Sequence, residues 1–162
     1  MIKIPSKVIR VGLLGLLPVL MLGVMLATHA LAGDKDKIVD GDESHVAIKG
    51  YDTIAYFTEQ RAVKGKEEFE FSWEGVRWLF SSAADRDLFA ADPERFSPQY
   101  GGHCALGMAA GKVGPINPEL WKIVDGKLYF ASSKAASDRF AANEAEIIKK
   151  ANQQWQSARG QN

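Results

Sequence analysis

Apolar and polar residues alternate along two segments of the chain, and a two-residue turn pair interrupts each alternation. Because alternate side chains share one face of a strand, each segment is predicted to form a hairpin with one apolar face. The first segment, 69–80, turns at Glu74-Gly75 and carries six apolar residues: Phe69, Phe71, Trp73, Val76, Trp78 and Phe80. The second, about 121–131, turns at Asp125-Gly126, so that Trp121 faces Phe130 and Ile123 faces Leu128. We expect the two faces to build one small antiparallel sheet.

Helix signals fill the gaps around these hairpins. Polar residues are placed to cap three helices: Ser82 for 83–91, Ser133 for a helix through Phe140, and Asn143 with Glu146 for the last helix. The last helix carries an apolar stripe that we expect to pack against the domain, formed by Ile147, Ile148, Ala151 and Trp155.

The segment 46–58 predicts a short strand, a turn at Gly50 and a second apolar element. The order of strands, helix, strands and helices lacks a βαβ rhythm. This order favours an α+β fold, with a small antiparallel sheet packed against three or four helices. We find no internal repeat and no low-complexity block in the sequence.

The N-terminus has the three-part order of a cleavable secretory signal. Three basic residues lie within the first ten positions, an apolar run covers 11–27, and Ala30 and Ala32 supply the small residues of a cleavage site. A retained membrane anchor is the alternative, but a stable span usually needs about 20 apolar residues, and this run is shorter and contains Pro18. We therefore expect cleavage of 1–32 and export to the periplasm or the medium.

The remaining chain divides into a flexible charged linker over 33–44, a domain over 45–157 and a tail over 158–162. Loss of 1–32 removes three of the 20 basic residues and none of the 20 acidic ones, which leaves a net charge of −3. A mildly acidic chain without a basic cluster is not expected to bind nucleic acid or, after cleavage, a membrane surface.

The chemistry-bearing segment is rich in glycine and alanine and surrounds Cys104, the one cysteine of the chain. If a helix begins at the glycines before it, Cys104 lies in the first turn, where unpaired N–H groups favour a thiolate. Met108 lies four residues further on the same face, His103 is adjacent, and His45 is the only other histidine after residue 32. Thiolate, thioether and imidazole suit copper(I), so these four residues are predicted metal ligands.

A structural zinc site is excluded because the sequence has no Cys-x-x-Cys or His-x-x-x-His pair. Any metal would therefore have two or three ligands from this chain, or be shared between two chains. The alternative for Cys104 is a small buried hydrophobe packed among glycines and alanines. Met108 alone is more typical of core filling.

Five stretches together resemble a YHS domain of the exported, single-domain bacterial type. They are Gly50 to Phe57, Phe69 to Phe80, Phe89 to Phe96, Gln99 to Ala105 (QYGGHCA) and Trp121 to Phe130 (WKIVDGKLYF). The resemblance covers residues 46 to about 157 and implies a small α+β domain linked to heavy metals, chiefly copper. By position, only Cys104 matches the cysteine linked to metal in that family. His103 stands where many members carry an aromatic residue, and Met108 where an aliphatic residue is common.

Three functional hypotheses follow. The first is a soft-metal (copper-type) binding or metal-homeostasis module centred on Cys104, with a metal ion or a metal-handling protein as partner. The second is a thiol-dependent enzyme, for which His103 is a poor base because adjacent helix residues point apart, while His45 would approach through the fold. The third is a small-molecule or protein-binding domain that uses four aromatic residues, unless these fill the core: Tyr51, Tyr56, Trp73 and Trp121.

Overall fold

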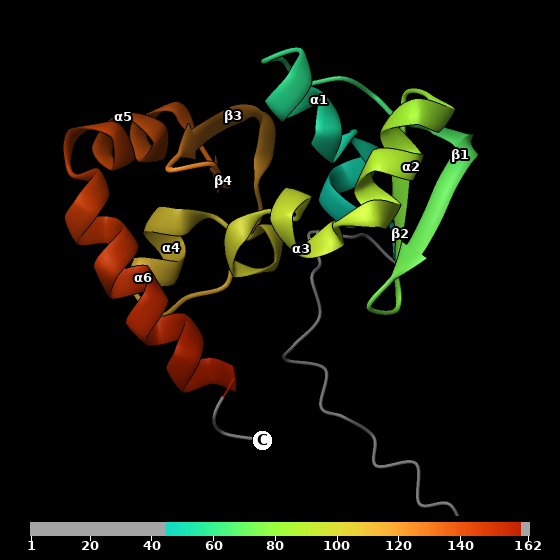
Figure 1. The fold of residues 1–162 in the computed structure, drawn as a ribbon. Coiled ribbons are helices and arrows are strands. Elements are labelled where there is room, and N and C mark those ends of the chain that lie inside the picture. The colour runs from blue at the N-terminus through green and yellow to red at the C-terminus, as the bar shows by residue number, and fades with distance from the viewer. Residues whose placement is uncertain (1–44, 160–162) are drawn as a thin grey trace, which may run out of the picture. The chain divides into compact units, whose positions relative to one another are not determined.

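The computed structural model of the chain describes residues 45–159, so the predicted signal segment and linker lie outside the described residues. The described part has an α+β fold with four strands, six α-helices and two short 3-10 turns (Figure 1). In chain order the elements are η1 (Ala47–Gly50), α1 (Thr53–Thr58), β1 (Lys66–Trp73), β2 (Val76–Phe80), α2 (Ala83–Ala91), α3 (Pro93–Phe96), η2 (Gln99–Gly102), α4 (Ala105–Ala109), β3 (Asn117–Val124), β4 (Lys127–Ala131), α5 (Lys134–Ala142) and α6 (Glu144–Arg159).

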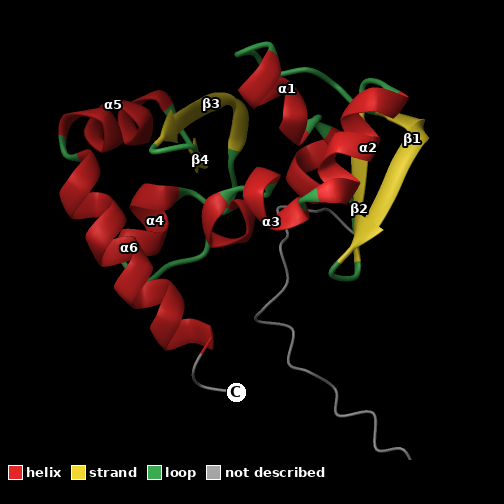
Figure 2. Cartoon of the chain, in the orientation of Figure 1, coloured by secondary structure: helices red, strands yellow, loops and turns green. Residues whose placement is uncertain are grey.

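Both predicted hairpins are confirmed, and their registers are confirmed next to the turns, while each register shifts further from the turn. Trp73 lies opposite Val76 across the first turn, and Trp121 lies opposite Phe130 in the second hairpin. However, the described strands form two separate two-stranded sheets (Figure 2), so the prediction of one shared sheet is wrong. An alternating pattern determines which face of a hairpin is apolar, but it does not determine what packs against that face or along the strand edges.

The predicted helix caps at the two serines are confirmed. Ser82 Oγ accepts a hydrogen bond from Asp85 N–H at the start of α2, and Ser133 Oγ accepts one from Ala136 N–H at the start of α5. The last helix, α6, begins directly after the predicted residue and runs to Arg159, beyond the predicted domain boundary at 157. The described residues contain six helices instead of three or four, because α1, α3 and α4 have only four to six residues and show no periodicity.

The predicted short strand at the start of the domain is replaced by an isolated bridge and a left-handed turn. Val46 bridges Arg77, and the chain then enters η1, where Ile48 and Lys49 have φ values of 42° and 55°. Left-handed conformations are costly for residues with a side chain. Two interactions hold this turn: Ile48 is fully buried, and Lys49 Nζ donates a hydrogen bond to the Ile116 carbonyl at 2.6 Å.

The order of elements occurs twice in the chain. A turn, a short helix, a hairpin and two helices (η1, α1, β1, β2, α2, α3) are followed by the same six elements (η2, α4, β3, β4, α5, α6). We name residues 45–96 the first repeat and residues 97–159 the second repeat. The inference from the sequence that no internal repeat is present is therefore wrong.

The local geometry of the two repeats agrees as well as the order. Each turn places two successive residues in the left-handed region and then a glycine of positive φ: Ile48, Lys49 and Gly50 in the first repeat, and Tyr100, Gly101 and Gly102 in the second. Each hairpin has strands of eight and five residues, with a register shift at the same place. Each is followed by a serine-capped helix of nine residues that buries a phenylalanine, Phe89 or Phe140.

Buried side chains form two clusters. The larger cluster joins the repeats, because it includes Phe89 of the first repeat with Leu128 and Phe130 of the second. The smaller cluster belongs to the second repeat, where Ile147 and Ala151 of α6 pack over η2 and α4. The predicted apolar stripe of the last helix is thus used for packing.

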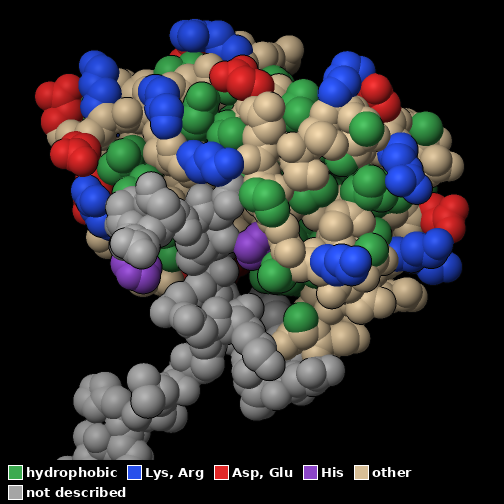
Figure 3. Space-filling model, turned by 180° about the vertical axis from the view of Figure 1, so that it is seen from behind, with side chains coloured by type: hydrophobic (Ala, Val, Ile, Leu, Met, Phe, Trp, Pro, Cys, Tyr) green, Lys and Arg blue, Asp and Glu red, His purple; other side chains and the backbone are tan. Residues whose placement is uncertain are grey.

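The surface of the described part has two relevant features. None of the described helices is long and apolar enough to cross a membrane. On the face seen in Figure 3, Lys and Arg side chains are spread over the surface and do not gather in one patch. The distribution of charge on this face does not by itself indicate a binding site.

Candidate functional site at Cys104

Cys104 lies where the η2 turn meets α4. It is the N-cap residue of that helix, one position before the first helical residue, and its backbone forms a parallel bridge with Phe130 of β4. Only 3% of its surface is exposed. The thiol makes no hydrogen bond to any residue within 45–159. The backbone therefore holds Cys104 firmly, while its sulfur has no polar partner in the described chain.

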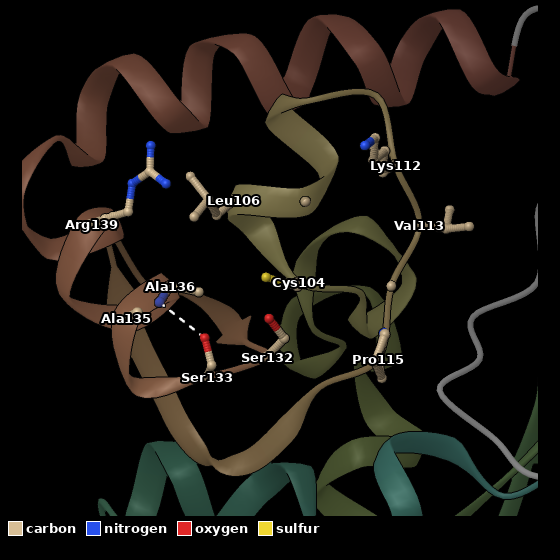
Figure 4. A pocket seen from close by; sticks show the side chains of 12 residues that line it. Cys104, Leu106, Lys112, Val113, Pro115, Ser132, Ser133, Ala135, Ala136 and Arg139 are labelled. Carbon is tan, nitrogen blue, oxygen red and sulfur yellow. Dashed lines mark hydrogen bonds between the residues drawn. The ribbon is translucent and has the colours of Figure 1, made fainter.

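A cavity of about 430 Å³ opens above this sulfur, and we name it the Cys104 cavity. Figure 4 shows the sulfur pointing into the space between α4, the segment 112–115 and the start of α5. The apolar part of the wall includes Leu106, Val113 and Pro115. A volume of this size lies within the range of small-molecule sites, which is typically about 300–1,000 Å³.

The polar part of the wall consists of hydroxyl groups and cations. Ser132 and Ser133 lie at the start of α5, and Lys112 and Arg139 extend from different walls (Figure 4). No Asp or Glu belongs to the lining, and neither cation has an ion-pair partner among the described residues. Because Ser133 Oγ already accepts the Ala136 N–H at 3.2 Å, its hydroxyl proton is left to donate. The charge of the lining favours an anionic ligand.

His103 supports the wall of the cavity and does not line it. Its ring nitrogen Nδ1 lies 3.2 Å from the carbonyl oxygen of Gly114, one of the lining residues. Since a carbonyl only accepts hydrogen bonds, Nδ1 carries the proton in this contact, and Nε2 is the nitrogen able to accept a proton or a metal. The imidazole is therefore a positioning group for the segment 112–115.

The other two predicted ligands do not line the Cys104 cavity. Met108 is buried in the smaller core cluster, whereas Cys104 belongs to the larger one. His45 is exposed, and its carbonyl accepts the backbone N–H of Arg77 in the first repeat. Within residues 45–159 no group of three or more His, Cys, Asp and Glu side chains is arranged to hold a metal ion.

The first repeat carries two carboxylates at positions that correspond to this cavity. Asp52 is the N-cap residue of α1 as Cys104 is that of α4, and Asp85 is the third residue of α2 as Ala136 is the third residue of α5. The Asp85 carboxylate accepts hydrogen bonds at 3.0 and 2.7 Å from the hydroxyls of the serine pair before α2. The second repeat has the same serine pair, but Cys104 and Ala136 stand at the positions that Asp52 and Asp85 occupy in the first repeat.

Of the polar residues of the cavity, only Cys104 was predicted from the sequence, and four others were not: Lys112, Ser132, Ser133 and Arg139. Ser133 was predicted only as a helix cap, Ser132 had no predicted role, and the two cations resembled other surface charges. A signal was present, because Ser81-Ser82 and the run 89–91 (FAA) occur again as Ser132-Ser133 and 140–142. Comparison of the chain with itself at this spacing aligns the two serine pairs.

The four aromatic residues considered for a pocket pack with other rings and the core. Tyr56 is fully buried, its ring lies 5.2 Å from that of Trp121, and its hydroxyl donates to the Pro118 carbonyl at 3.0 Å. Burial raises the pKa of Tyr56, so the phenol remains protonated. Tyr51 and Trp73 pack, partly buried, against the larger core cluster.

Comparison with known proteins finds no relative of this chain. No family model, no curated protein and no solved structure matches the chain.

Proposed function

We propose that the second repeat binds a small organic anion in the Cys104 cavity, with a carboxylate or similar group on the hydroxyls of Ser132 and Ser133. One observation carries this proposal. The first repeat holds the Asp85 carboxylate on two serine hydroxyls, whereas the second repeat keeps the hydroxyls and has Ala136 and a cavity in place of the carboxylate. A ligand carboxylate would therefore meet donors of the kind that already bind one in this fold.

The charge of the lining supports an anion. Lys112 and Arg139 are exposed and line the cavity, and no acidic residue opposes them there. An exposed ion pair contributes only about 0–1 kcal/mol. The cations therefore add selectivity for an anion and a faster association rate, while the hydroxyls and the apolar wall supply much of the affinity.

The apolar wall indicates a ligand with a short hydrocarbon body. Val113 is 68% exposed, an unusual state for a large aliphatic side chain in this domain, and it lies beside Leu106 and Pro115 in the lining. A ligand that covered these side chains would remove apolar surface from water. A short aliphatic carboxylate combines this body with the charged group that the serines and cations require.

The test uses hexanoate as the probe and hexanamide as its neutral analogue of the same shape. In an NMR titration of the purified protein, hexanoate should shift the amide signals of residues 104–115 and 132–139. Hexanamide should bind at least about fivefold more weakly, because a difference of about 1 kcal/mol in binding free energy is close to that ratio. Equal binding of the two probes, or shifts confined to other parts of the domain, would refute the proposal.

A pair of matched variants separates the cavity from the general charge of the protein. Arg139→Gln should weaken hexanoate binding about fivefold, since it removes one cation of the lining. Arg95→Gln removes an exposed arginine of α3 that is not part of the lining and should leave the affinity unchanged. The same loss in both variants would mean that the effect is nonspecific.

Soft-metal binding is the second candidate, favoured by the thiol of Cys104 that faces the cavity without a polar partner. A thiolate suits copper(I), and the resemblance to YHS domains points in the same direction. Met108 lies in the other core cluster, and within residues 45–159 no group of three or more His, Cys, Asp and Glu side chains is arranged to hold a metal ion. A metal at Cys104 would therefore have two or three ligands from this chain, or be shared between two chains.

Competition with a copper(I) chelator tests this candidate. The protein should withdraw copper(I) from the chelator, and Cys104→Ser should abolish the transfer. Met108→Leu, which preserves the size of a buried side chain, should retain it. Transfer that survives in Cys104→Ser, or no transfer at all, would exclude a metal site at this sulfur.

A further inference from the structure

A second cavity adjoins the Cys104 cavity on the side of α6, and we name it the α6 cavity. Its volume is about 360 Å³, and it lies between α4, the end of α5 and the first turns of α6. Leu106 and Arg139 line both cavities. Figure 4 shows these two side chains between Cys104 and the α6 helix. They therefore form the partition that separates the two cavities.

Side-chain motion is sufficient to connect the cavities. Arg139 is exposed and Leu106 is only partly buried, and the Arg139 guanidinium has no hydrogen-bond or ion-pair partner within residues 45–159. Exposed side chains change rotamer on the picosecond to nanosecond timescale. A flexible hydrocarbon chain can thus pass between Leu106 and Arg139 without a change in the backbone.

The polar groups of the α6 cavity offer mainly hydrogen-bond donors and positive charge. The acidic residue of its lining, Glu146, forms an ion pair with Lys150 at 2.8 Å. The hydrogen bond and the charge of Lys150 lower the pKa of Glu146, so this pair is neutral as a whole. The Asn143 amide has no side-chain partner in the described chain, and Arg139 adds an uncompensated positive charge. An anionic group in this cavity would meet the donors of Asn143 and Arg139.

The first repeat does not have this set of groups. Leu88 is the sixth residue of α2, as Arg139 is the sixth residue of α5. Asp92 follows α2 as Asn143 follows α5, but the Asp92 carboxylate accepts a hydrogen bond from Arg95 N–H at 3.3 Å. Within the described residues the Asn143 side chain makes no such bond. The cation and the free amide therefore belong to the second repeat, in which the two cavities lie side by side.

We infer that the two cavities form one site for a straight-chain dicarboxylate. This inference rests on the proposed function, which places the first carboxylate on the hydroxyls of Ser132 and Ser133. The hydrocarbon chain passes Leu106, and the second carboxylate lies in the α6 cavity at the amide of Asn143. Arg139 lies at the partition and attracts both carboxylates, so its charge serves the whole site.

Two other end groups fit the α6 cavity less well. An ammonium group needs an acceptor, and the Glu146 carboxylate is already paired with Lys150. A methyl group makes no hydrogen bond, so it would remove water from Asn143 and Arg139 without replacing the lost bonds. A second carboxylate is therefore the end group that this lining favours.

The first test compares suberate with octanoate, which has the same chain length and a methyl group in place of the second carboxylate. In an NMR titration, suberate should bind at least about fivefold more tightly. It should also shift the amide signals of residues 143–150 in addition to those of 104–115 and 132–139. The ω-amino acid of the same length should bind more weakly than suberate. The inference is overturned if octanoate or the amino acid binds as tightly as suberate, because a carboxylate without partners costs affinity.

The second test changes the charges of the α6 cavity. Lys150→Gln leaves the Glu146 carboxylate unpaired beside the second carboxylate of the ligand. It should weaken suberate binding at least about threefold more than octanoate binding, whereas Glu146→Gln should strengthen suberate binding. Lys149→Gln is the matched control and should leave both affinities unchanged, because Lys149 is exposed on α6 and lines neither cavity. Equal effects of the two lysine variants on suberate binding would overturn the inference.

The monocarboxylates distinguish failure of this inference from failure of the proposed function. If hexanoate and octanoate bind in the Cys104 cavity but suberate binds no more tightly than octanoate, this inference alone is refuted. If none of these acids binds, the proposed function and this inference are both refuted.

Discussion

Replacing Ala136 with Asp would give the second repeat the carboxylate that the first repeat carries at Asp85. Ala136 is the third residue of α5, is 7% exposed and lines the Cys104 cavity. A carboxylate at this position would accept hydrogen bonds from the hydroxyls of Ser132 and Ser133, in the way that Asp85 accepts them from its own serine pair. The substitution should close the ligand site from within the protein.

Three contributions determine the size of the effect. An acidic residue in the first turn of a helix stabilises it by about 0.3–1 kcal/mol. A hydrogen bond to a charged group contributes about 1.5–3 kcal/mol, and the serine distances of 2.7 and 3.0 Å at Asp85 show that this geometry is attainable. Desolvation of the new charge opposes these gains. We expect Ala136→Asp to stabilise the protein by about 1 kcal/mol and to weaken hexanoate binding at least about tenfold.

Urea denaturation and the hexanoate titration measure the two effects separately. Ala136→Asn is the uncharged control of the same shape, and the Asp variant should be the more stable of the two at neutral pH. This difference should shrink as the pH falls through the pKa of the new carboxyl, because its stabilising hydrogen bonds require the ionised form. A loss of more than about 1 kcal/mol relative to the original protein, or an unchanged hexanoate affinity, would refute the correspondence between the two serine pairs.

Further substitutions test the two cores and the turns. Phe89→Ala should destabilise the protein by about 4–5 kcal/mol and Phe140→Ala by about 3 kcal/mol, because Phe89 packs against four aromatic rings and Phe140 against one; equal losses in urea denaturation would contradict this ranking. Gly102→Ala should cost about 1–2 kcal/mol because φ is +83° there, and an unchanged Tm would rule out this reason. Tyr100→Phe should cost about 1 kcal/mol in urea denaturation, because the Tyr100 hydroxyl donates to Asn152 Oδ1 at 2.9 Å; no loss would show that water replaces this bond.

Features that depend on residues close together in sequence were predictable. The pairs Glu74-Gly75 and Asp125-Gly126 determine the register of each hairpin next to its turn, because a two-residue turn leaves one choice of opposite residues. Each capping serine lies three residues before the residue whose backbone N–H donates a hydrogen bond to its hydroxyl. These interactions have a fixed spacing in the sequence, so the sequence alone reveals them.

Features that depend on contacts between distant segments were not predictable in this way. The Trp78 ring lies 4.8 Å from that of Phe89, and the Tyr129 ring lies 5.5 Å from that of Phe140. Each hairpin therefore packs on its own helix, and the prediction of a shared sheet was wrong. The second strand of each hairpin also buries successive residues, 78–80 and 128–131, so both of its faces are covered, which alternation does not predict. The surroundings of Cys104 depend in the same way on α5 and the segment 112–115, which local patterns do not relate to it.

The repeat was not predicted because few residues are the same in the two halves. Among the shared residues are the serine pair, one of which caps the helix, and the phenylalanine with its two alanines, which any such helix could carry. Most other aligned positions differ, including Asp52 with Cys104 and Asp85 with Ala136. The similarity therefore lies in the order and geometry of the elements, which residue identity does not reveal.

The helix α1 is stabilised by a side-chain hydrogen bond at its N-cap, which α4 lacks. Packing against α6 stabilises α4 instead. Asp52 ties α1 to the end of β2, whereas Cys104 makes no comparable bond. The first repeat ends in a helix of four residues, but α6 has 16 residues and packs Ile147 and Ala151 against Met108 of α4. Burial of one such aliphatic side chain contributes about 1.5–3 kcal/mol, which is comparable with a hydrogen bond to a charged group. The longer last helix thus stabilises α4, whose N-cap residue Cys104 makes no side-chain hydrogen bond to the helix.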